Sequence, residues 1–501
     1  MNRIIPHPDQ RHGLATLLVL VLISVALAVT YALVRSQGTV SLLQTNDRLR
    51  ATARQAALTG MAVARRTLHT ADWPGADSTL TGSAGPHASY LIQFTTGDPA
   101  LTPADPDFPD YPYRLTVQVT GSSADPTDPQ RAATQRLAAV FRLTARALAS
   151  EPPLWETISR YTFFQSKADT TVLNVPCGIE GPVRLQGRLE LAEGLHWSTA
   201  ARQRYLVDLN RMRRATDRDQ RPLTGPVEMP FDRQSAGLVA LLEQGMEVSL
   251  TDEPPTAVSL RPDGFADSYQ LYPGGKVYSA QRLGPILRNR TLQPDPLTNP
   301  LGIFVRRGRL DLWDGVTIRG TLVVRGASNG DVHIWGHAVR LAPVDLPPLY
   351  GSELPVRLPT LVLEDDLRLR PGCEGSIEGM VFVGHEYDVR SDWQSGIQMP
   401  IRGHLVARRV LVRPRFPWIR WPHWWNQQYQ EFVAQAASGI PHFPQWLASE
   451  AGLDPTPRIT ISPADSPARY HWRRPGDPIY VPHPEDEGLR WELLRWIEEP
   501  Q

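Results

Sequence analysis

The feature that most constrains this chain is an uninterrupted apolar run at residues 14–34, LATLLVLVLISVALAVTYALV. The run contains no charged residue, no proline and no glycine. As an α-helix it would extend about 30 Å, which matches the hydrocarbon thickness of a lipid bilayer. It therefore predicts a single membrane-spanning helix, with anchor positions that include Leu14, Leu18, Leu22 and Val34.

Two interpretations of residues 1–35 are open. A signal peptide would be removed after residues 26–28, Ala-Leu-Ala, which fit the small-x-small rule for cleavage. Against removal, the apolar run continues past this triplet, and no polar, helix-breaking segment follows it. A retained anchor is therefore favoured. The basic residues on the two sides of the run are nearly balanced, so the positive-inside rule only weakly favours a cytoplasmic N-terminus.

The helical pattern continues through residues 36–70. Apolar residues recur there at spacings of three, four or multiples near them, and most arginines lie off the face that they form. The face comprises Val40, Leu43, Ala53, Ala57, Met61, Ala64 and Leu68. This alanine-rich face could pack against its own domain or against like helices in a filament, and the periodicity leaves both alternatives open.

The first 70 residues resemble a known family. A short basic leader ends in Gly13, and the apolar helix after it runs into an alanine- and glutamine-rich segment, ARQAA, at residues 53–57. This arrangement resembles the N-terminus of type IV pilin-like proteins, in particular minor pilins and pseudopilins. In that family a prepilin peptidase cleaves after the glycine, here between Gly13 and Leu14. Leu18 occupies the position at which major pilins carry a glutamate. Some tip-located minor pseudopilins also lack this glutamate.

The resemblance also implies a location and partners. Residues 1–13 would be a cytoplasmic leader. Residues 14–70 would stay in the inner membrane, or pack into a pilus core against other pilin or pseudopilin subunits. The rest of the chain would then lie in the periplasm or at the cell surface.

Composition excludes some functions. The chain has 501 residues, of which 52 are basic and 52 acidic. It lacks the clustered positive charge of a nucleic-acid binder, so no nucleic-acid partner is expected. Two cysteines do not make a structural zinc site, and no metal or cofactor is expected. Cys177 and Cys373 could form a disulfide in an oxidising compartment or remain unpaired thiols, and the sequence does not decide between these alternatives.

Residues 71–150 predict a small α+β head, with the helix ended by Pro74 and Gly75. Residues 76–90 are rich in Ser, Thr, Gly and Ala and indicate a loop. Strands are expected at residues 90–94, 113–120 and 135–148, the last two paired with each other. The carboxylates between the first two strands lack the pattern of a calcium loop and indicate a solvated acidic turn. They are Asp98, Asp105, Asp107 and Asp110.

Residues 151–196 and 301–413 have a different pattern of apolar residues and glycines. Short apolar stretches recur at nearly even spacing and are separated by glycines. This pattern favours a β-solenoid over a sandwich, whose strands would be longer and joined by hairpin turns. The chain is therefore expected to be mainly β with a long N-terminal helix and a right-handed β-helix-like body.

Residues 197–300 are expected to interrupt this body. Helices are predicted at residues 198–216 and 238–246, and the remainder indicates loop and turn. Residues 414–501 are rich in tryptophan, with four between positions 416 and 425. This segment could cover the open end of the solenoid, bind carbohydrate or form an interface with another pilus component. A short helix is predicted at residues 489–499.

No catalytic sequence motif is found, so an enzyme is not expected. A polysaccharide-cleaving β-helix needs two or three carboxylates on one face. Candidates are Asp311, Asp331, Asp365, Asp366 and Glu378, with the pair His385-Glu386 nearby. Each of these is also an ordinary residue for an outward-facing strand position. The favoured function is a pilin-like structural protein, a minor or tip component of a type IV pilus or secretion pseudopilus. The alternative is an envelope-anchored β-helix protein that binds or cleaves polysaccharide.

Overall fold

The structure is a computed structural model of the chain. It describes residues 9–147, 158–173, 177–187, 189–191, 226–230, 248–251, 267–326, 329–349, 351–370, 372–392, 397–415, 459–471, 478–482 and 491–497. The chain divides into two compact units. The head unit comprises Met1–Pro99, Arg114–Leu143 and Arg490–Gln501, and the body unit comprises Ala100–Tyr113 and Thr144–Leu489.

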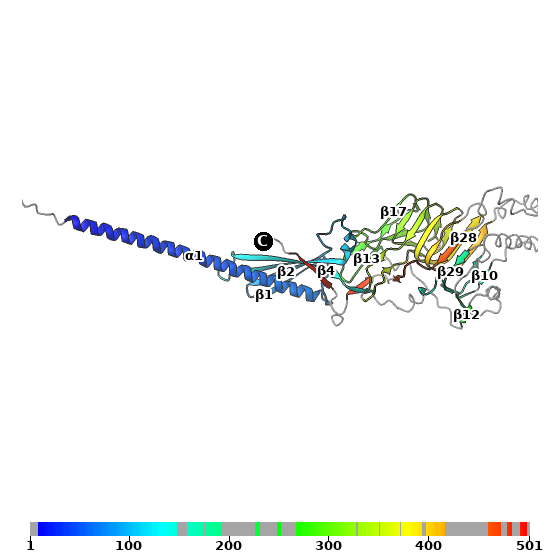
Figure 1. Ribbon diagram of the computed structural model, residues 1–501, viewed down its shortest axis with the longest axis horizontal. Helices are drawn as coiled ribbons and strands as arrows, with labels where there is room; N and C mark the ends of the chain where they lie inside the picture. Colours follow the sequence, from blue (N-terminus) through cyan, green and yellow to red (C-terminus); the bar gives the residue numbers. More distant parts are fainter. Residues whose placement is uncertain are drawn as a thin grey trace, which may run out of the picture. The chain divides into compact units, whose positions relative to one another are not determined.

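The head unit begins with one unbroken helix, α1, which spans Asp9–Thr67 (Figure 1). The helix contains a segment that is long and apolar enough to cross a membrane, by length and composition. The anchor side chains predicted from the sequence are all exposed on it. Residues 26–28 lie inside the helix, with no change of structure at the small-x-small triplet. The expected continuation of the apolar run into a second helical segment is confirmed.

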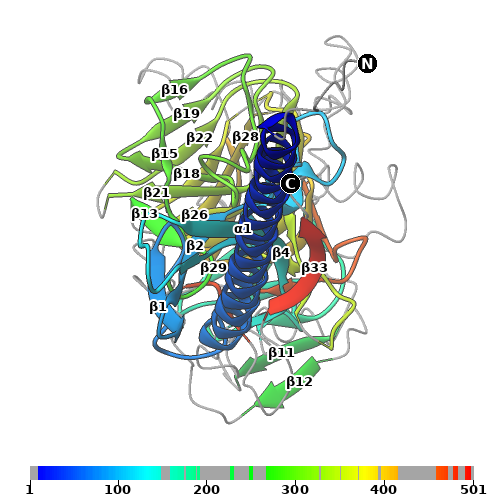
Figure 2. The ribbon, with the colours of Figure 1, turned by 90° about the vertical axis from the view of Figure 1, so that its left-hand side faces the viewer.

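The later part of α1 packs on an antiparallel sheet (Figure 2). The order of the sheet is β1-β2-β3-β4-β33. These strands are β1 (Thr79–Gly85), β2 (Ala88–Thr96), β3 (Arg114–Ala124), β4 (Ala132–Leu143) and β33 (Trp491–Ile497). Alternate residues of the central strands face the helix, and the largest of them form a closed apolar layer. The layer includes Ile92, Phe94, Leu115, Val117, Val119 and Phe141.

The apolar face of the helix is confirmed in its later part only. Ala53, Ala57, Met61, Ala64 and Leu68 are buried. The two earlier members of the predicted face remain about half exposed, at 48% and 57% for Val40 and Leu43. The helix therefore packs against its own domain from residue 49 onward, and the part before it presents apolar side chains.

Three strand predictions in the head are confirmed. The predicted strands at residues 90–94 and 113–120 correspond to β2 and β3. The strand predicted at residues 135–148 corresponds to β4 as far as Leu143, and β3 pairs with β4 in antiparallel register. Residues 145–147 form a separate strand.

The loop predicted at residues 76–90 is wrong, because β1 and the start of β2 occupy it. The small polar residues of β1 look like a loop in sequence, yet they suit an edge strand with one exposed face.

Two further corrections concern the head. The helix predicted at residues 489–499 is wrong, since residues 491–497 form β33 and pair with β4. Asp98 is not solvated but 1% exposed. Its carboxylate accepts hydrogen bonds from Arg114 of β3, at 3.1 Å, and from Arg495 of β33. A buried carboxylate needs such partners, because desolvation of an unpaired charge is costly.

The body unit consists mainly of one curled parallel sheet, whose strands form three ladders. The first ladder contains, in spatial order, β15 (Gln281–Arg282), β18 (Ile303–Arg307), β21 (Thr321–Arg325), β26 (Leu361–Leu363), β28 (Gly375–Asp392), β29 (Ile401–Arg415), β6 (Phe163–Gln165), β9 (Val183–Arg184), β11 (Val227–Pro230) and β12 (Val248–Thr251).

The long strands β28 and β29 also contribute to the other two ladders. The second ladder adds β16 (Ile286–Leu287), β19 (Leu310–Leu312), β22 (Val332–Ile334), β27 (Leu367–Leu369), β7 (Thr171–Leu173) and β10 (Leu189–Leu191). The third adds β17 (Thr291–Leu292), β20 (Thr317–Arg319), β23 (Val339–Ala342), β30 (Ile459–Ser462) and β8 (Cys177–Ile179). Inward-facing aliphatic residues from all three ladders form one continuous core.

The spatial order of the body differs from the order of the sequence. Strands β6 and β8, which come early in the chain, stack directly on β29 and β30, which come late. Strands β15, β16 and β17 lie at the opposite end of the ladders. The two β-rich segments expected from the sequence are therefore joined at a seam where Phe163 lies opposite Leu405.

The prediction of an interruption at residues 197–300 is wrong in part. Strands β11, β12, β15, β16 and β17 all lie in this range and extend the ladders. Residues 272–276 join an antiparallel pair, β13 (Ser268–Gln270) and β14 (Val277–Ser279). The helices predicted at residues 198–216 and 238–246, and the tryptophan-rich residues 416–425, lie outside the described residues.

Shorter elements complete the described part of the body. They are the 3-10 helix η1 (Phe108–Tyr113), an antiparallel pair of β5 (Ala145–Ala147) with β32 (Tyr480–Pro482), and a small sheet of β24 (Asp345–Leu346), β25 (Val356–Arg357) and β31 (Arg469–Tyr470).

Candidate functional site

The candidate carboxylates lie along the outer surface of the second ladder. Asp311 projects outward from β19, because its neighbours Leu310 and Leu312 are buried in the core. In the register of the ladder it lies opposite His333 of β22, which in turn lies opposite Arg368 of β27. Successive strands thus place three polar side chains in one outward-facing row.

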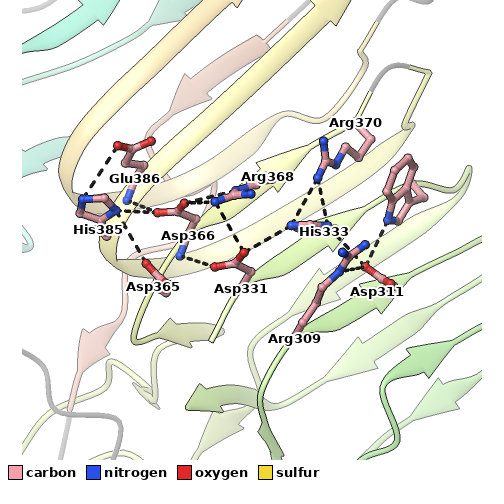
Figure 3. A network of polar contacts seen from close by, with 11 residues as sticks. Arg309, Asp311, Asp331, His333, Asp365, Asp366, Arg368, Arg370, His385 and Glu386 are labelled. Atoms are coloured by element: carbon pink, nitrogen blue, oxygen red, sulfur yellow. Dashed lines mark hydrogen bonds and ion pairs between the residues drawn. The ribbon is translucent and has the colours of Figure 1, made fainter. Parts of the chain in front are cut away.

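A second group of carboxylates lies just before these strands begin. Asp331 precedes β22, and Asp365 and Asp366 precede β27. Figure 3 shows them converging with His385 and Glu386 of β28. The His385 Nδ1 atom lies 2.9 Å from Asp366 Oδ1 and 3.7 Å from Asp365 Oδ1, and the backbone N–H of Glu386 donates to Asp366 Oδ1 at 3.0 Å.

Arginines neutralise much of this charge. Arg368 Nη2 donates to Asp366 Oδ2 at 2.6 Å and lies 3.6 Å from Asp331 Oδ2. Arg409 of β29 is paired with Glu386. Asp311 accepts a hydrogen bond from Arg309 Nε at 2.8 Å. His333 lies between the two groups, with ring nitrogens 3.5 Å from Asp311 and from Asp331.

The surroundings of Asp365 and Asp331 shift the pKa values of their carboxyls in opposite directions. Burial, followed by the negative charges of Asp366 and Asp331, raises the pKa of Asp365 to about 6. Burial also raises the pKa of Asp331, but the hydrogen bond from His333 and the charge of Arg368 outweigh this effect, so its pKa lies below the usual range. One carboxyl can therefore hold a proton near pH 6 while the other stays ionised.

Three of these residues could hold a metal ion. One ligand atom each of Asp365, Asp366 and His385 lies within 4.8 Å of the others. Two carboxylates and an imidazole suit several divalent cations. However, both oxygens of Asp366 already accept hydrogen bonds, one from Arg368 and the other from Glu386. Asp366 is therefore already occupied by donors of the protein, and the expectation of no metal stays a prediction.

Aromatic side chains lie beside the carboxylates on the same surface. Trp313 and Trp335 follow directly after β19 and β22, and their rings stack with centroids 5.7 Å apart and planes 9° from parallel. The guanidinium of Arg370 covers Trp335, 4.7 Å from the ring centroid. The Trp335 Nε1–H donates to Asp311 at 3.2 Å, which fixes the ring against the polar row.

The structure brings most of the sequence candidates together. Asp311, Asp331, Asp365 and Asp366 belong to one network with His385 and Glu386. Glu378 does not join them in the described contacts, since it lies in β28 opposite Arg402, between the first and third ladders.

The sequence analysis missed the residues that connect the network. They are His333, Arg368, Arg370, Trp313 and Trp335. Each lies in or just after a strand of the second ladder. A polar or aromatic residue recurs within or directly after these short apolar strands, and this recurrence was a sequence signal for the row. The loops between strands differ in length, so the sequence alone does not align one strand with the next.

The remaining candidates lie elsewhere. Gly13 and Leu14, the predicted cleavage site, lie in the first turns of α1. Cys373 is a free, buried thiol, and burial raises its pKa to about 12. In this structure it is therefore not a disulfide partner. Cys177 lies in β8, and its side chain is outside the described part of the chain.

Comparisons with known proteins are sparse. No protein-family model matches the chain, and no curated protein matches it significantly. Among solved structures, the chain is similar to the competence-associated pilin ComZ from Thermus thermophilus. The two share 11% identity over 90% of this chain and 97% of that chain, with a TM-score of 0.25. A TM-score this low does not establish a shared fold, so the comparison carries no weight for function.

Proposed function

We propose that the chain is a membrane-anchored, pilin-like structural protein that carries a large β-helical body. It acts as a minor or tip component of a type IV pilus or a type II secretion pseudopilus, in assembly, adhesion or secretion. Its N-terminus is cytoplasmic, α1 lies in the inner membrane, and the body lies in the periplasm or at the cell surface. Its partners are other pilin or pseudopilin subunits, and prepilin peptidase processes it.

The observation that carries this proposal is the divided environment of α1. The helix runs unbroken from an apolar segment, whose large side chains are all at least half exposed from Leu14 to Val34, to a face that packs on an antiparallel sheet. If the apolar segment were a removable signal peptide, it would not be expected to form one continuous helix with the core helix of a domain. A retained helix that anchors the chain with one end and the head with the other accounts for both parts.

For the body, we propose a closed right-handed β-helix without catalytic activity. Three ladders of parallel strands, each visited in turn along the chain, support the β-helix. Right-handed connections between parallel strands are strongly preferred, which supports the hand. The ion pairs that Arg368 and Arg409 form with the carboxylates of the network support a structural role for those groups.

The test is the N-terminus of the mature protein, measured by mass spectrometry of membrane fractions. The proposal expects a mature chain that starts at Leu14, and it expects Gly13→Ala to block processing while the protein stays in the membrane. Gly38→Ala is a matched control, because it makes the same change within α1 where an added Cβ meets nothing within 4 Å. A mature chain that starts at Val29 would show a removed signal peptide and contradict the proposal.

A further inference from the structure

The outer surface of the second ladder carries two parallel rows of side chains. One row consists of flat groups, Trp313, Trp335 and Arg370, stacked across successive strands. The other consists of hydrogen-bonding groups, with Asp311 and His333 at its centre. Neighbouring strands in a sheet are about 4.8 Å apart, so both rows present a repeated spacing along the ladder. We call this surface the polar–aromatic strip.

One member of the flat row is open to solvent. Trp313 ends the stack and is 36% exposed, whereas His333 in the adjacent row is 2% exposed. The Trp313 ring stacks on Trp335, whose own ring is held by its hydrogen bond to Asp311. A large, stacked and partly exposed indole is an energetically strong contact for a ligand, because little conformational entropy is lost when it binds.

The carboxylates in and beside the strip form ion pairs with arginines. Asp311 is paired with Arg309, Asp366 with Arg368, and Glu386 with Arg409. Next to Trp313, Asp314 is paired with Arg288 at 3.2 Å. Paired charges offer donors and acceptors without a strong field of one sign, so they do not favour a polyanion or a polycation.

We infer that the polar–aromatic strip binds an uncharged polysaccharide, with Trp313 as the stacking platform. A sugar ring has an apolar face of C–H groups that packs on an indole, and hydroxyls around its edge that both donate and accept hydrogen bonds. Beside Trp313, exposed donors and an acceptor come from Arg309, Arg288 and Asp314, whose side chains are 47%, 64% and 40% exposed. The inference rests on the proposed function only in placing the body outside the cytoplasm, where such polymers occur.

The test uses the full chain in detergent micelles. Binding is measured by affinity electrophoresis in gels that contain hydroxyethyl cellulose and by calorimetry with N-acetylglucosamine hexamer. The wild type is expected to bind at least one of these uncharged glycans, and Trp313→Ala to bind it about tenfold more weakly, the loss expected for one stacking contact. Trp313→Phe keeps a flat ring and is expected to retain most of the affinity.

The matched control is Trp496→Ala in the head unit, where an indole is 51% exposed but has no such strip. It is expected to bind as the wild type does. The inference is overturned if the wild type binds neither glycan, if Trp313→Ala binds as well as the wild type while melting at the same temperature, or if the anionic polymer alginate binds more tightly than both. None of these outcomes changes the mature N-terminus, so the proposed function is judged separately.

Discussion

At the scale of single residues, Gly121 sets the distance between α1 and the head sheet. A Cβ atom at this position of β3 would lie 2.2 Å from the carbonyl oxygen of Ala53 and 2.4 Å from the amide nitrogen of Ala57. Both atoms belong to the helix backbone, which cannot move aside as a flexible side chain can. The alanines on the helix and the glycine on the strand therefore allow the same close contact from its two sides.

Gly121→Ala is expected to lower the free energy of unfolding of the head by about 1–3 kcal/mol, the usual cost of overpacking a core. Thermal unfolding followed by circular dichroism measures this change. Gly85→Ala is the control, because an added Cβ on β1 meets nothing within 4 Å, and its effect should stay below about 0.5 kcal/mol. Equal melting temperatures for the two variants would contradict the close approach.

Asp365 gives the body a dependence of stability on pH. Its pKa in the folded chain is about 6, compared with an ordinary value of 3.8. Between these pH values the folded chain holds a proton that the unfolded chain has lost. The contribution of this group to stability is therefore complete below about pH 4 and is lost as the pH rises through about 6.

Asp365→Asn removes the charge that is unfavourable at neutral pH. We expect the variant to be more stable than the wild type at pH 7.5 by about 1–2 kcal/mol, less than the full shift implies because solvent screens a partly exposed group. The gain should shrink towards zero at pH 4. Urea unfolding at the two pH values measures it. Asp314→Asn is the contrasting variant and should show no gain, because a hydrogen bond from the backbone amide of His337 lowers the pKa of Asp314.

How well the site could be predicted also depends on single residues. The acidic members of the network, such as Asp365 and Asp366, were recognisable as candidates because carboxylates are conspicuous in a sequence. Their partners Arg368 and His333 were not, because an arginine or histidine in a strand has no local signature of the charge opposite it. Trp313 was missed for the same reason, since its role depends on Trp335, which belongs to another strand.

At the scale of elements, β33 shows how tertiary contacts override local sequence preference. Residues 491–497 contain glutamate, leucine and arginine, which favour a helix in isolation. In the structure Trp491 is 0% exposed and packs edge-on against Trp73, with ring centroids 5.9 Å apart. Its backbone N–H donates to His69 Nε2 at 3.2 Å, and Arg495 pairs with the buried Asp98. These contacts exist only when the segment is extended along β4.

A chain that stops after Leu489 should lose this strand and its contacts. We expect the head to unfold at a lower temperature, because Asp98 loses one partner and the cavity left by Trp491 alone costs about 3–5 kcal/mol. Limited proteolysis, followed by mass spectrometry of cuts within Arg114–Leu143, measures the exposure of β3 and β4. Resistance equal to that of the full chain would show that β33 contributes little.

The strands of the body were easier to predict than their arrangement. Apolar pairs and glycine corners identified β18 to β23 and β26 to β29 in sequence. The seam between β6 and β29 could not be predicted, because it joins positions more than 200 residues apart. Neither strand contains a sequence feature that identifies its pairing partner. Within residues 197–300, two-residue strands such as β16 and β17 are too short to show a period.

At the scale of the whole molecule, the body is inserted into the head in two segments, a short one at Ala100–Tyr113 and a long one at Thr144–Leu489. Leu143 at the end of β4 lies directly opposite Trp491 at the start of β33, so the segment between them leaves and returns at one point of the head sheet. The two strands around this point have the geometry of a hairpin whose turn has been replaced by more than 300 residues.

Replacing residues 144–490 by Asn-Gly removes the long segment of the body and keeps its short segment, Ala100–Tyr113. The head should then fold by itself. Asn-Gly favours the tight turn that joins two antiparallel strands. We expect a cooperative thermal transition and a circular dichroism spectrum of mixed helix and sheet in detergent. The same replacement in a chain with Trp491→Ala is the control and should melt at a lower temperature. A head that shows no cooperative transition would mean that its fold requires the body.

The insertion also has a consequence in time. Because β33 comes after the body in the sequence, the ribosome produces α1 and β1 to β4 long before the strand that completes their sheet. A chain that stalls within the body, or is cut there and loses its C-terminal part, keeps its helix but leaves the edge of β4 bare, and unpaired strand edges are where chains aggregate or are captured. The head sheet therefore acquires its last described strand only after the body has been synthesised.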